Sequence, residues 1–223
     1  MSIADNLKKI RASLPENVEL VCVSKFHPAS VVLEAYSAGE RVFGESREQE
    51  LKTKQAELPK DIQWHFIGHL QTNKVKTIVP VVSLIHSVDS EKLLREINKE
   101  AAKENKVVNC LLQLHIAQEE TKFGFSFEEA ELFFKSGQLN GLSNICIKGL
   151  MGMATYTDNL QQVHQEFQSL KDFFDYTRIT CFDNSPDFSI LSMGMSDDYT
   201  IAIEEGSTMV RIGSSIFGTR INS

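Results

Sequence analysis

Apolar residues follow two alternating patterns along the chain, helical spacing and short continuous runs. Ile3, Leu7 and Ile10 are spaced as on one face of a helix, which predicts a helix over residues 2–13. The pattern then predicts eight strands, nearly all of which alternate with helices. The predicted strands cover 18–24, 41–44, 62–67, 81–85, 107–116, 145–150, 188–191 and 209–212. Among the predicted helices are those at 45–58, 69–79, 90–106, 159–176 and 196–204, the last capped by Ser196.

This alternation predicts an α/β fold, because strands separated by helices run parallel and are joined by right-handed crossovers. Eight such units suggest a (β/α)8 barrel, although the 223 residues are fewer than the roughly 250 typical of that fold. An open doubly wound sheet would normally carry a GxGxxG turn after its first strand, and the sequence has none there. We therefore favour the barrel. Without any linker-like or low-complexity tract, we predict one domain over residues 1–223.

Composition and charge say more about the cellular compartment and the classes of partner than about the reaction or the ligand. The formal net charge of -7 argues against nucleic acid or an anionic membrane as the main partner. Apolar runs are shorter than a membrane span, and the first residues do not resemble a signal peptide. The four cysteines form no CxxC pair, which suggests free thiols in a reducing compartment. We expect a soluble cytoplasmic protein, and we consider metal binding by His65 and His69 unlikely because no HExxH motif is present.

Lys25 stands at the end of the first predicted strand. Burial lowers the pKa of a lysine, and the free amine can then attack a carbonyl to form a Schiff base. The ordinary alternative is a strand-end lysine whose charge reaches water along a flexible stem. In a (β/α)8 barrel the active site lies at the C-terminal ends of the strands, so we expect Lys25 at the barrel mouth.

The segments after the seventh and eighth strands have the residues of a phosphate site. In this fold, phosphate is often held by these two loops, and Gly194 and Gly213 would let the backbone approach an anion closely. Hydroxyl groups are supplied by Ser192, Ser196, Ser214 and Ser215. Ordinary turns with capping serines would explain the same residues. Arg211 shares a strand face with Gly213, so its guanidinium could hold a ring nitrogen or an anion, or could form a structural ion pair.

Seven motifs spread over almost the whole chain resemble those of the pyridoxal phosphate homeostasis proteins. The motifs are Val-Ser-Lys (23–25), Phe-Gly-Glu (43–45), Trp-His-Phe-Ile-Gly-His-Leu-Gln-Thr-Asn-Lys (64–74), Lys-Phe-Gly (122–124), Gly-Leu-Met (149–151), Leu-Ser-Met-Gly-Met-Ser-Asp (191–197) and Arg-Ile-Gly (211–213). The resemblance implies a single barrel like the N-terminal domain of alanine racemase. It also implies a protein that carries or regulates intracellular pyridoxal 5′-phosphate.

The resemblance assigns roles to particular residues. It implies that pyridoxal 5′-phosphate forms an internal aldimine with Lys25 and that Arg211 faces the pyridine nitrogen. The phosphate contacts transfer to Ser192, Gly213 and Ser214. Independently of the resemblance, the residue type of Met193 predicts that it belongs to the core and the pocket wall beside the cofactor. Ser46 stands where the family usually has an asparagine near the cofactor, so that contact is altered. Ser214 replaces the usual threonine and keeps its hydroxyl group.

The sequence leaves two hypotheses for this site, that it only binds the cofactor or that it also catalyses a reaction. An arginine beside the pyridine nitrogen opposes its protonation, which weakens the ring as an electron sink and suits racemisation better than transamination. Racemisation also needs a second acid or base, a tyrosine from another domain in alanine racemases. Among the tyrosines only Tyr156 lies near a predicted strand end, so we predict a homeostasis protein, with pyridoxal-phosphate-dependent apoenzymes as candidate partners. Because we expect no second domain, we also predict a monomer. A weak racemase-like enzyme and a Schiff-base aldolase acting on a sugar phosphate are the two alternatives.

Overall fold

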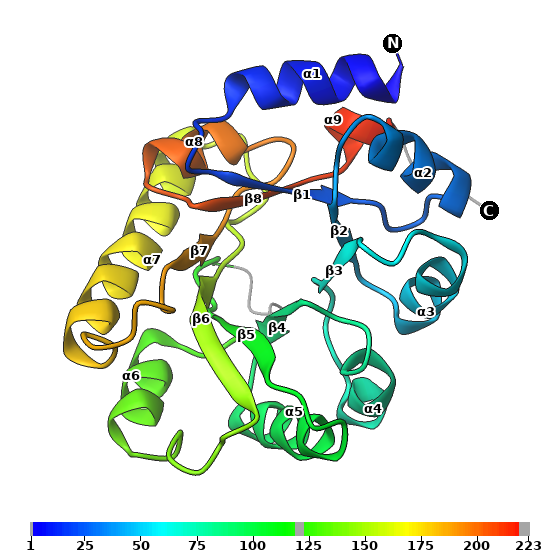
Figure 1. The fold of residues 1–223 in the computed structure, drawn as a ribbon. Helices are drawn as coiled ribbons and strands as arrows, with labels where there is room; N and C mark the ends of the chain where they lie inside the picture. Colours follow the sequence, from blue (N-terminus) through cyan, green and yellow to red (C-terminus); the bar gives the residue numbers. More distant parts are fainter. Residues whose placement is uncertain (1, 119–122, 219–223) are drawn as a thin grey trace.

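The computed structural model describes residues 2–118 and 123–218, and in it eight parallel strands close into a barrel in chain order (Figure 1). The strands are β1 (Glu19–Val23), β2 (Val42–Glu45), β3 (Gln63–Phe66), β4 (Leu84–Val88), β5 (Val108–Gln113), β6 (Ile145–Met151), β7 (Ile190–Ser192) and β8 (Met209–Ile212). The barrel closes between its first and last strands, where Glu19 pairs with Met209 and Cys22 with Ile212. This architecture confirms the predicted (β/α)8 fold.

Helices surround the barrel (Figure 1). They are α1 (Ile3–Ser13), α2 (Ala29–Ser37), α3 (Glu48–Glu57), α4 (Val75–Ile78), α5 (Glu91–Lys103), α6 (Phe127–Lys135), α7 (Leu160–Thr180), α8 (Tyr199–Glu204) and α9 (Ser214–Phe217), with a 3-10 turn, η1 (Thr72–Lys74), before α4. Several begin with a cap that accepts a free backbone N–H. The Ser126 side chain caps α6 through the N–H of Glu129, and Ser90 caps α5 through Leu93.

Two layers of side chains fill the barrel between its strands. The lower layer is apolar and consists of Val21, Leu84, Leu111, Met151 and Met209, which come from five different strands. The upper layer is polar. It comes from β4, β5, β7 and β8, two residues further along each strand. Its members are His86, Gln113, Ser192 and Arg211, all buried. Because strand residues two apart point to the same side, the polar layer lies directly toward the C-terminal ends of the strands.

The larger hydrophobic core lies between the barrel and its helices. Outward-facing strand residues such as Phe43 and Trp64, whose ring centroids are 6.0 Å apart, belong to it. The apolar stripe of α5 packs here, and its residues Leu93, Leu94 and Ile97 are almost inaccessible to solvent. Burial of apolar side chains against the barrel is what holds these amphipathic helices in place.

Three local predictions were wrong. Strand β4 begins at Leu84 rather than at residue 81, because Val82 is still in the turn that follows α4, its N–H bonded to the carbonyl of Ile78. The helix predicted over 69–79 is reduced to η1 and α4. Helix α8 starts at Tyr199 after Asp198, and Ser196 is not its cap. The hydroxyl of Ser196 instead accepts the N–H of Gly213, 3.2 Å away.

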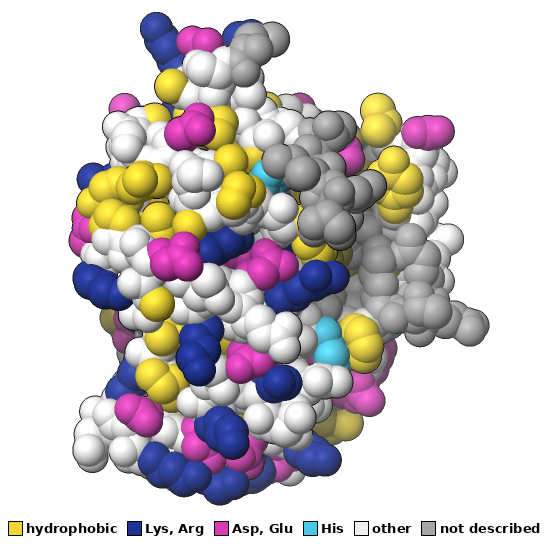
Figure 2. Space-filling view, turned by 90° about the vertical axis from the view of Figure 1, so that its right-hand side faces the viewer, with side chains coloured by type: hydrophobic (Ala, Val, Ile, Leu, Met, Phe, Trp, Pro, Cys, Tyr) yellow, Lys and Arg dark blue, Asp and Glu magenta, His cyan; other side chains and the backbone are white. Residues whose placement is uncertain are grey.

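Charges are mixed on the face shown in Figure 2, where acidic and basic side chains are interspersed and not gathered by sign. The net charge of -7 is thus not concentrated in one patch of this face. Within the part of the chain that the structure describes, no helix has both the length and the apolar character needed to cross a bilayer.

Candidate functional site

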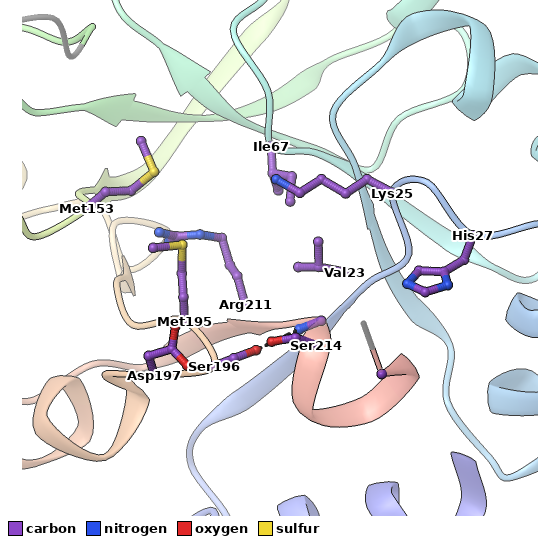
Figure 3. Close-up of a pocket in the computed structure, with 12 residues that line it drawn as sticks. Val23, Lys25, His27, Ile67, Met153, Met195, Ser196, Asp197, Arg211 and Ser214 are labelled. Carbon is purple, nitrogen blue, oxygen red and sulfur yellow. Dashed lines mark hydrogen bonds between the residues drawn. The ribbon is translucent and has the colours of Figure 1, made fainter. Parts of the chain in front are cut away.

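A pocket of about 260 Å³ opens at the C-terminal end of the barrel (Figure 3). It lies above the polar layer, between the ends of β1, β3, β6 and β8. The residues that line it are Val23, Lys25, His27, Ile67, Met153, Met195, Ser196, Asp197, Arg211, Gly213, Ser214 and Gly218. Figure 3 shows Lys25 and Arg211 entering from different walls, with Ser196 and Ser214 close together on another wall.

Lys25 stands two residues after the last residue of β1 and reaches into this pocket. Its side chain is half-buried, and Ser24 before it is fully buried. Figure 3 shows the side chain extending across the mouth toward Ile67. Lys25 therefore presents a primary amine inside a largely enclosed space, as expected for a lysine that reacts with a carbonyl.

Arg211 is held by the barrel interior. Nη1 donates to the carbonyl oxygen of Ser192 at 2.9 Å and to its hydroxyl at 2.7 Å, and Nη2 donates to the carbonyl of Gly152 at 3.1 Å. Burial lowers the pKa of Arg211 to about 10, so the group is still charged at neutral pH. A guanidinium has five N–H donors, so these three bonds to the described residues leave two for a ligand.

A chain of buried hydrogen bonds continues from Arg211 beneath the pocket. The Ser192 hydroxyl lies 3.0 Å from Nδ1 of His86, and Nε2 of His86 lies 3.0 Å from Nδ1 of His65. Burial lowers the pKa of His65 to about 4 and lowers that of His86 well below its ordinary value, so both rings are neutral. Arg211 can only donate to Ser192. If the hydroxyl donates to Nδ1 of His86, then Nε2–H of His86 donates to Nδ1 of His65, and each of these bonds has one donor and one acceptor.

Opposite the two cations, the pocket wall is a cup made by Ser196, Gly213 and Ser214, with Asp197 at its edge. Gly213 has no room for a side chain, because a Cβ there would be 2.9 Å from the carbonyl oxygen of Val23. Two hydroxyl groups and a bare stretch of backbone therefore meet at one end of the pocket. Such a surface suits a small oxyanion.

The structure brings together four of the seven residues predicted to bind a ligand. Lys25, Arg211, Gly213 and Ser214 line the pocket. Ser192 lies one layer lower, where its hydroxyl contacts Arg211 and His86. Met193 faces away from the barrel axis and is buried in the outer core. Ser46 is half-buried at the end of β2, outside the pocket lining.

Other motif residues have different surroundings. His69 lies 2.8 Å from a carboxylate oxygen of Asp89 and stacks on Phe123, with ring centroids 4.0 Å apart. Lys122 of the Lys-Phe-Gly motif is outside the described residues. Among the residues with described positions, no three potential ligands are grouped to hold a metal ion. The four cysteines carry free thiols.

Sequence reasoning missed His27 and His86. His27 is buried in the pocket wall, its ring 5.3 Å from that of Phe217, and burial lowers its pKa. Its place in the same turn as Lys25, after the first strand, was the signal that the sequence offered. His86 was hidden because it fell beyond the predicted end of the fourth strand. Only the correct strand boundary aligns it with Ser192 and Arg211.

Comparison with known sequences gives consistent matches over nearly the full chain. The family model described as the alanine racemase N-terminal domain matches residues 1–221. The pyridoxal phosphate homeostasis protein of Aquifex aeolicus is 42% identical over 212 residues, 94% of this chain and 91% of that protein. The protein of the same name from Schizosaccharomyces pombe is 39% identical and covers 92% of this chain and 85% of its own.

Solved structures agree with these matches. PipY of Synechococcus elongatus without pyridoxal phosphate superposes with a TM-score of 0.90 at 36% identity, covering 97% of this chain and 100% of that one. The same protein with pyridoxal phosphate bound has a TM-score of 0.87 at 35% identity. Alanine racemase of Clostridium difficile has a TM-score of 0.78, but at 15% identity and over 58% of its length this likeness shows the fold alone.

Proposed function

The chain belongs to the pyridoxal phosphate homeostasis proteins, and from this membership we propose that it binds pyridoxal 5′-phosphate in the pocket at the barrel mouth. The observation that supports this most directly is the placement of Lys25, Arg211 and the Ser196–Gly213–Ser214 cup around one cavity. When bound, the cofactor supplies an aldehyde that condenses with a primary amine, and an aromatic ring that withdraws electrons.

The residues present fit the chemical groups of that cofactor. Lys25 would hold the aldehyde carbon covalently. Arg211 keeps two N–H donors for the pyridine nitrogen and remains charged, so it opposes protonation of the ring. Ser196 and Ser214 would donate hydroxyl hydrogen bonds to the phosphate, and Gly213 lines the same end of the pocket.

We infer a binding and supply function, with no reaction assigned. Tyr156, the tyrosine nearest a strand end, is 89% exposed, and no tyrosine is among the described residues that line the pocket. A tyrosine that could act as the second acid or base for racemisation is therefore not observed among these lining residues. The relatives' names support homeostasis over a racemase or an aldolase. We infer that the protein works as a cytoplasmic monomer that exchanges the cofactor with apoenzymes, and the free thiols support a reducing compartment.

Borohydride reduction of the purified protein tests the proposal. The protein should be yellow, or become yellow with added pyridoxal 5′-phosphate, and reduction should attach the cofactor mass to the peptide that contains Lys25. Lys25→Ala should lose the attachment and keep its circular dichroism spectrum. Lys52→Ala, at an exposed position on α3, is the control and should keep the attachment. A colourless wild-type protein, or an adduct that persists in Lys25→Ala, would contradict the proposal.

A further inference from the structure

The backbone on both sides of Lys25 is held by side chains of helix α3. The carbonyl oxygen of Ser24, just before it, accepts a hydrogen bond from Nζ of Lys54 at 2.8 Å. The N–H of Phe26, just after it, donates to Oε2 of Glu50 at 2.7 Å. Both contacts are to backbone atoms, so they control the path of the chain at Lys25 whatever side chain is there.

The group that makes these contacts is charged and buried. Lys54 donates to Oε1 of Glu45 at 2.7 Å, with side-chain exposures of 5% and 0%. Ser24 donates its hydroxyl to the same oxygen at 2.6 Å, and Oε2 of Glu45 has no hydrogen-bond partner among the described atoms. Buried ion pairs contribute little net stability, since the desolvation of both charges offsets their attraction. In some proteins such a pair specifies one local geometry, and the segment in contact with this pair is the loop that carries Lys25.

The loop needs such support because its backbone is strained. Phe26 has φ = 68°, in the left-handed region that a bulky residue seldom adopts. Its ring lies under the guanidinium of Arg47, 4.5 Å from the ring centroid, so the same segment also holds the side chain. Strained backbone of this kind persists only where surrounding contacts determine it, and it is common where a reactive group must be aimed.

We propose that Lys54, with Glu45 and Glu50, positions Lys25 for reaction with the aldehyde of the cofactor while taking no part in noncovalent binding. This inference rests on the proposed function. None of the three residues is among those that line the pocket. Their effect should therefore be confined to ligands that can bond to the lysine.

Two ligands and two substitutions on one helix test this separation. Pyridoxal 5′-phosphate has the aldehyde, whereas pyridoxine 5′-phosphate has an alcohol in its place and binds only noncovalently. We expect Lys54→Met to weaken binding of the aldehyde by about 10-fold to 100-fold, the effect of misplacing a reacting group by roughly 1 Å. Binding of the alcohol should change less than about twofold, within the spread expected for a residue outside the pocket. Lys52→Met, an exposed lysine of the same helix, should leave both affinities unchanged.

A second pair of variants covers the case in which Lys54→Met fails to fold. Glu50 is 23% exposed and can be changed without stranding the buried pair. Glu50→Ala removes the acceptor for the Phe26 N–H and should weaken only aldehyde binding, whereas Glu50→Gln keeps an acceptor oxygen and should restore it. Equal loss for both ligands, or no loss for either, in the folded variants would overturn the inference. A wild-type protein that binds both ligands equally would instead overturn the proposed function.

Discussion

Ser192 links Arg211 to the histidines beneath the pocket, and its replacement by alanine should be costly. The hydroxyl is fully buried and accepts from Nη1 of Arg211 at 2.7 Å while it pairs with Nδ1 of His86 at 3.0 Å. A hydrogen bond to a charged group contributes about 1.5–3 kcal/mol, and an unsatisfied buried group costs about 1–3 kcal/mol. Arg211 keeps its bonds to two backbone carbonyls, which limits the damage. We therefore expect Ser192→Ala to lower the free energy of unfolding by about 3 kcal/mol.

Urea unfolding at neutral pH measures this loss. For a chain of this size, about 3 kcal/mol corresponds to a decrease in Tm of roughly 6–12 °C. Ser189→Ala is the matched control, because Ser189 is exposed just before β7 and its hydroxyl makes a contact of only 3.5 Å, to Asp187. We expect this control to stay within about 0.5 kcal/mol of the wild type. The m-value should be the same for all three proteins if the folded state is intact.

The ligand-binding result separates stability from function in the same variant. Ser192→Ala removes one of the hydrogen bonds that hold Arg211, so the guanidinium should be positioned less accurately at the pocket. Binding of pyridoxine 5′-phosphate should therefore weaken by about 3-fold to 10-fold. Stability within about 0.5 kcal/mol of the wild type would refute the account of the buried chain, because a surface hydroxyl behaves that way. Normal ligand affinity despite the stability loss would show that Arg211 is positioned by its backbone contacts alone.

Three further outcomes follow from particular residues. His65 has a folded pKa of about 4, below its ordinary value of 6.5, so the unfolded chain binds more protons between these pH values. Its share of the free energy of unfolding should fall by about 2 kcal/mol from pH 7 to pH 5, and urea unfolding of His65→Asn should show a smaller loss. Gly149→Ala should lower the free energy of unfolding by more than about 4 kcal/mol or prevent folding, since φ is 150° and a Cβ would collide with the carbonyl of Ile190. Gly141 also has a positive φ but has open space around it, so Gly141→Ala should lose only about 1 kcal/mol of stability by thermal unfolding. Asp197→Asn removes an exposed carboxylate from the cup and should tighten pyridoxine 5′-phosphate by about 2-fold to 5-fold at low salt, an effect that titrations in about 1 M salt should abolish.

The barrel could be predicted because the sequence pattern that specifies it is local and is repeated along the chain. Most strands are short apolar runs and most helices carry an apolar stripe, so the alternation is visible without any long-range information. The predicted end of β4 was wrong because polar residues continue the strand there. His86 and Ser87 are polar, yet both are buried inside or beside the barrel, where hydrogen bonds satisfy them. A hydrophobic pattern ends a strand at such residues, and only the closed barrel reveals their partners.

The site was predictable in part for a related reason. Lys25 and Arg211 could be placed at the mouth because strand ends in this fold converge there. Whether Met193 points into the barrel or into the outer core depends on the side to which Ser192 of β7 points. Ser192 faces the barrel interior, so Met193 faces the helices and is buried among them. The positioning role inferred for Lys54 was beyond sequence reasoning, since α3 contacts the loop of Lys25 only after the chain has folded.

The two cations of the pocket are supported from opposite sides. Arg211 is held from within, by the polar layer that includes Ser192 and His86, whereas the loop of Lys25 is held from outside, by Lys54 and Glu50. The hydrogen bonds of the two supports have no residue in common. A change in one can therefore alter its own contact with the ligand and leave the other in place. Under the proposed function, in which the cofactor is held and later released, this arrangement would let the covalent bond through Lys25 be weakened while the noncovalent contacts still retain the ligand in the pocket.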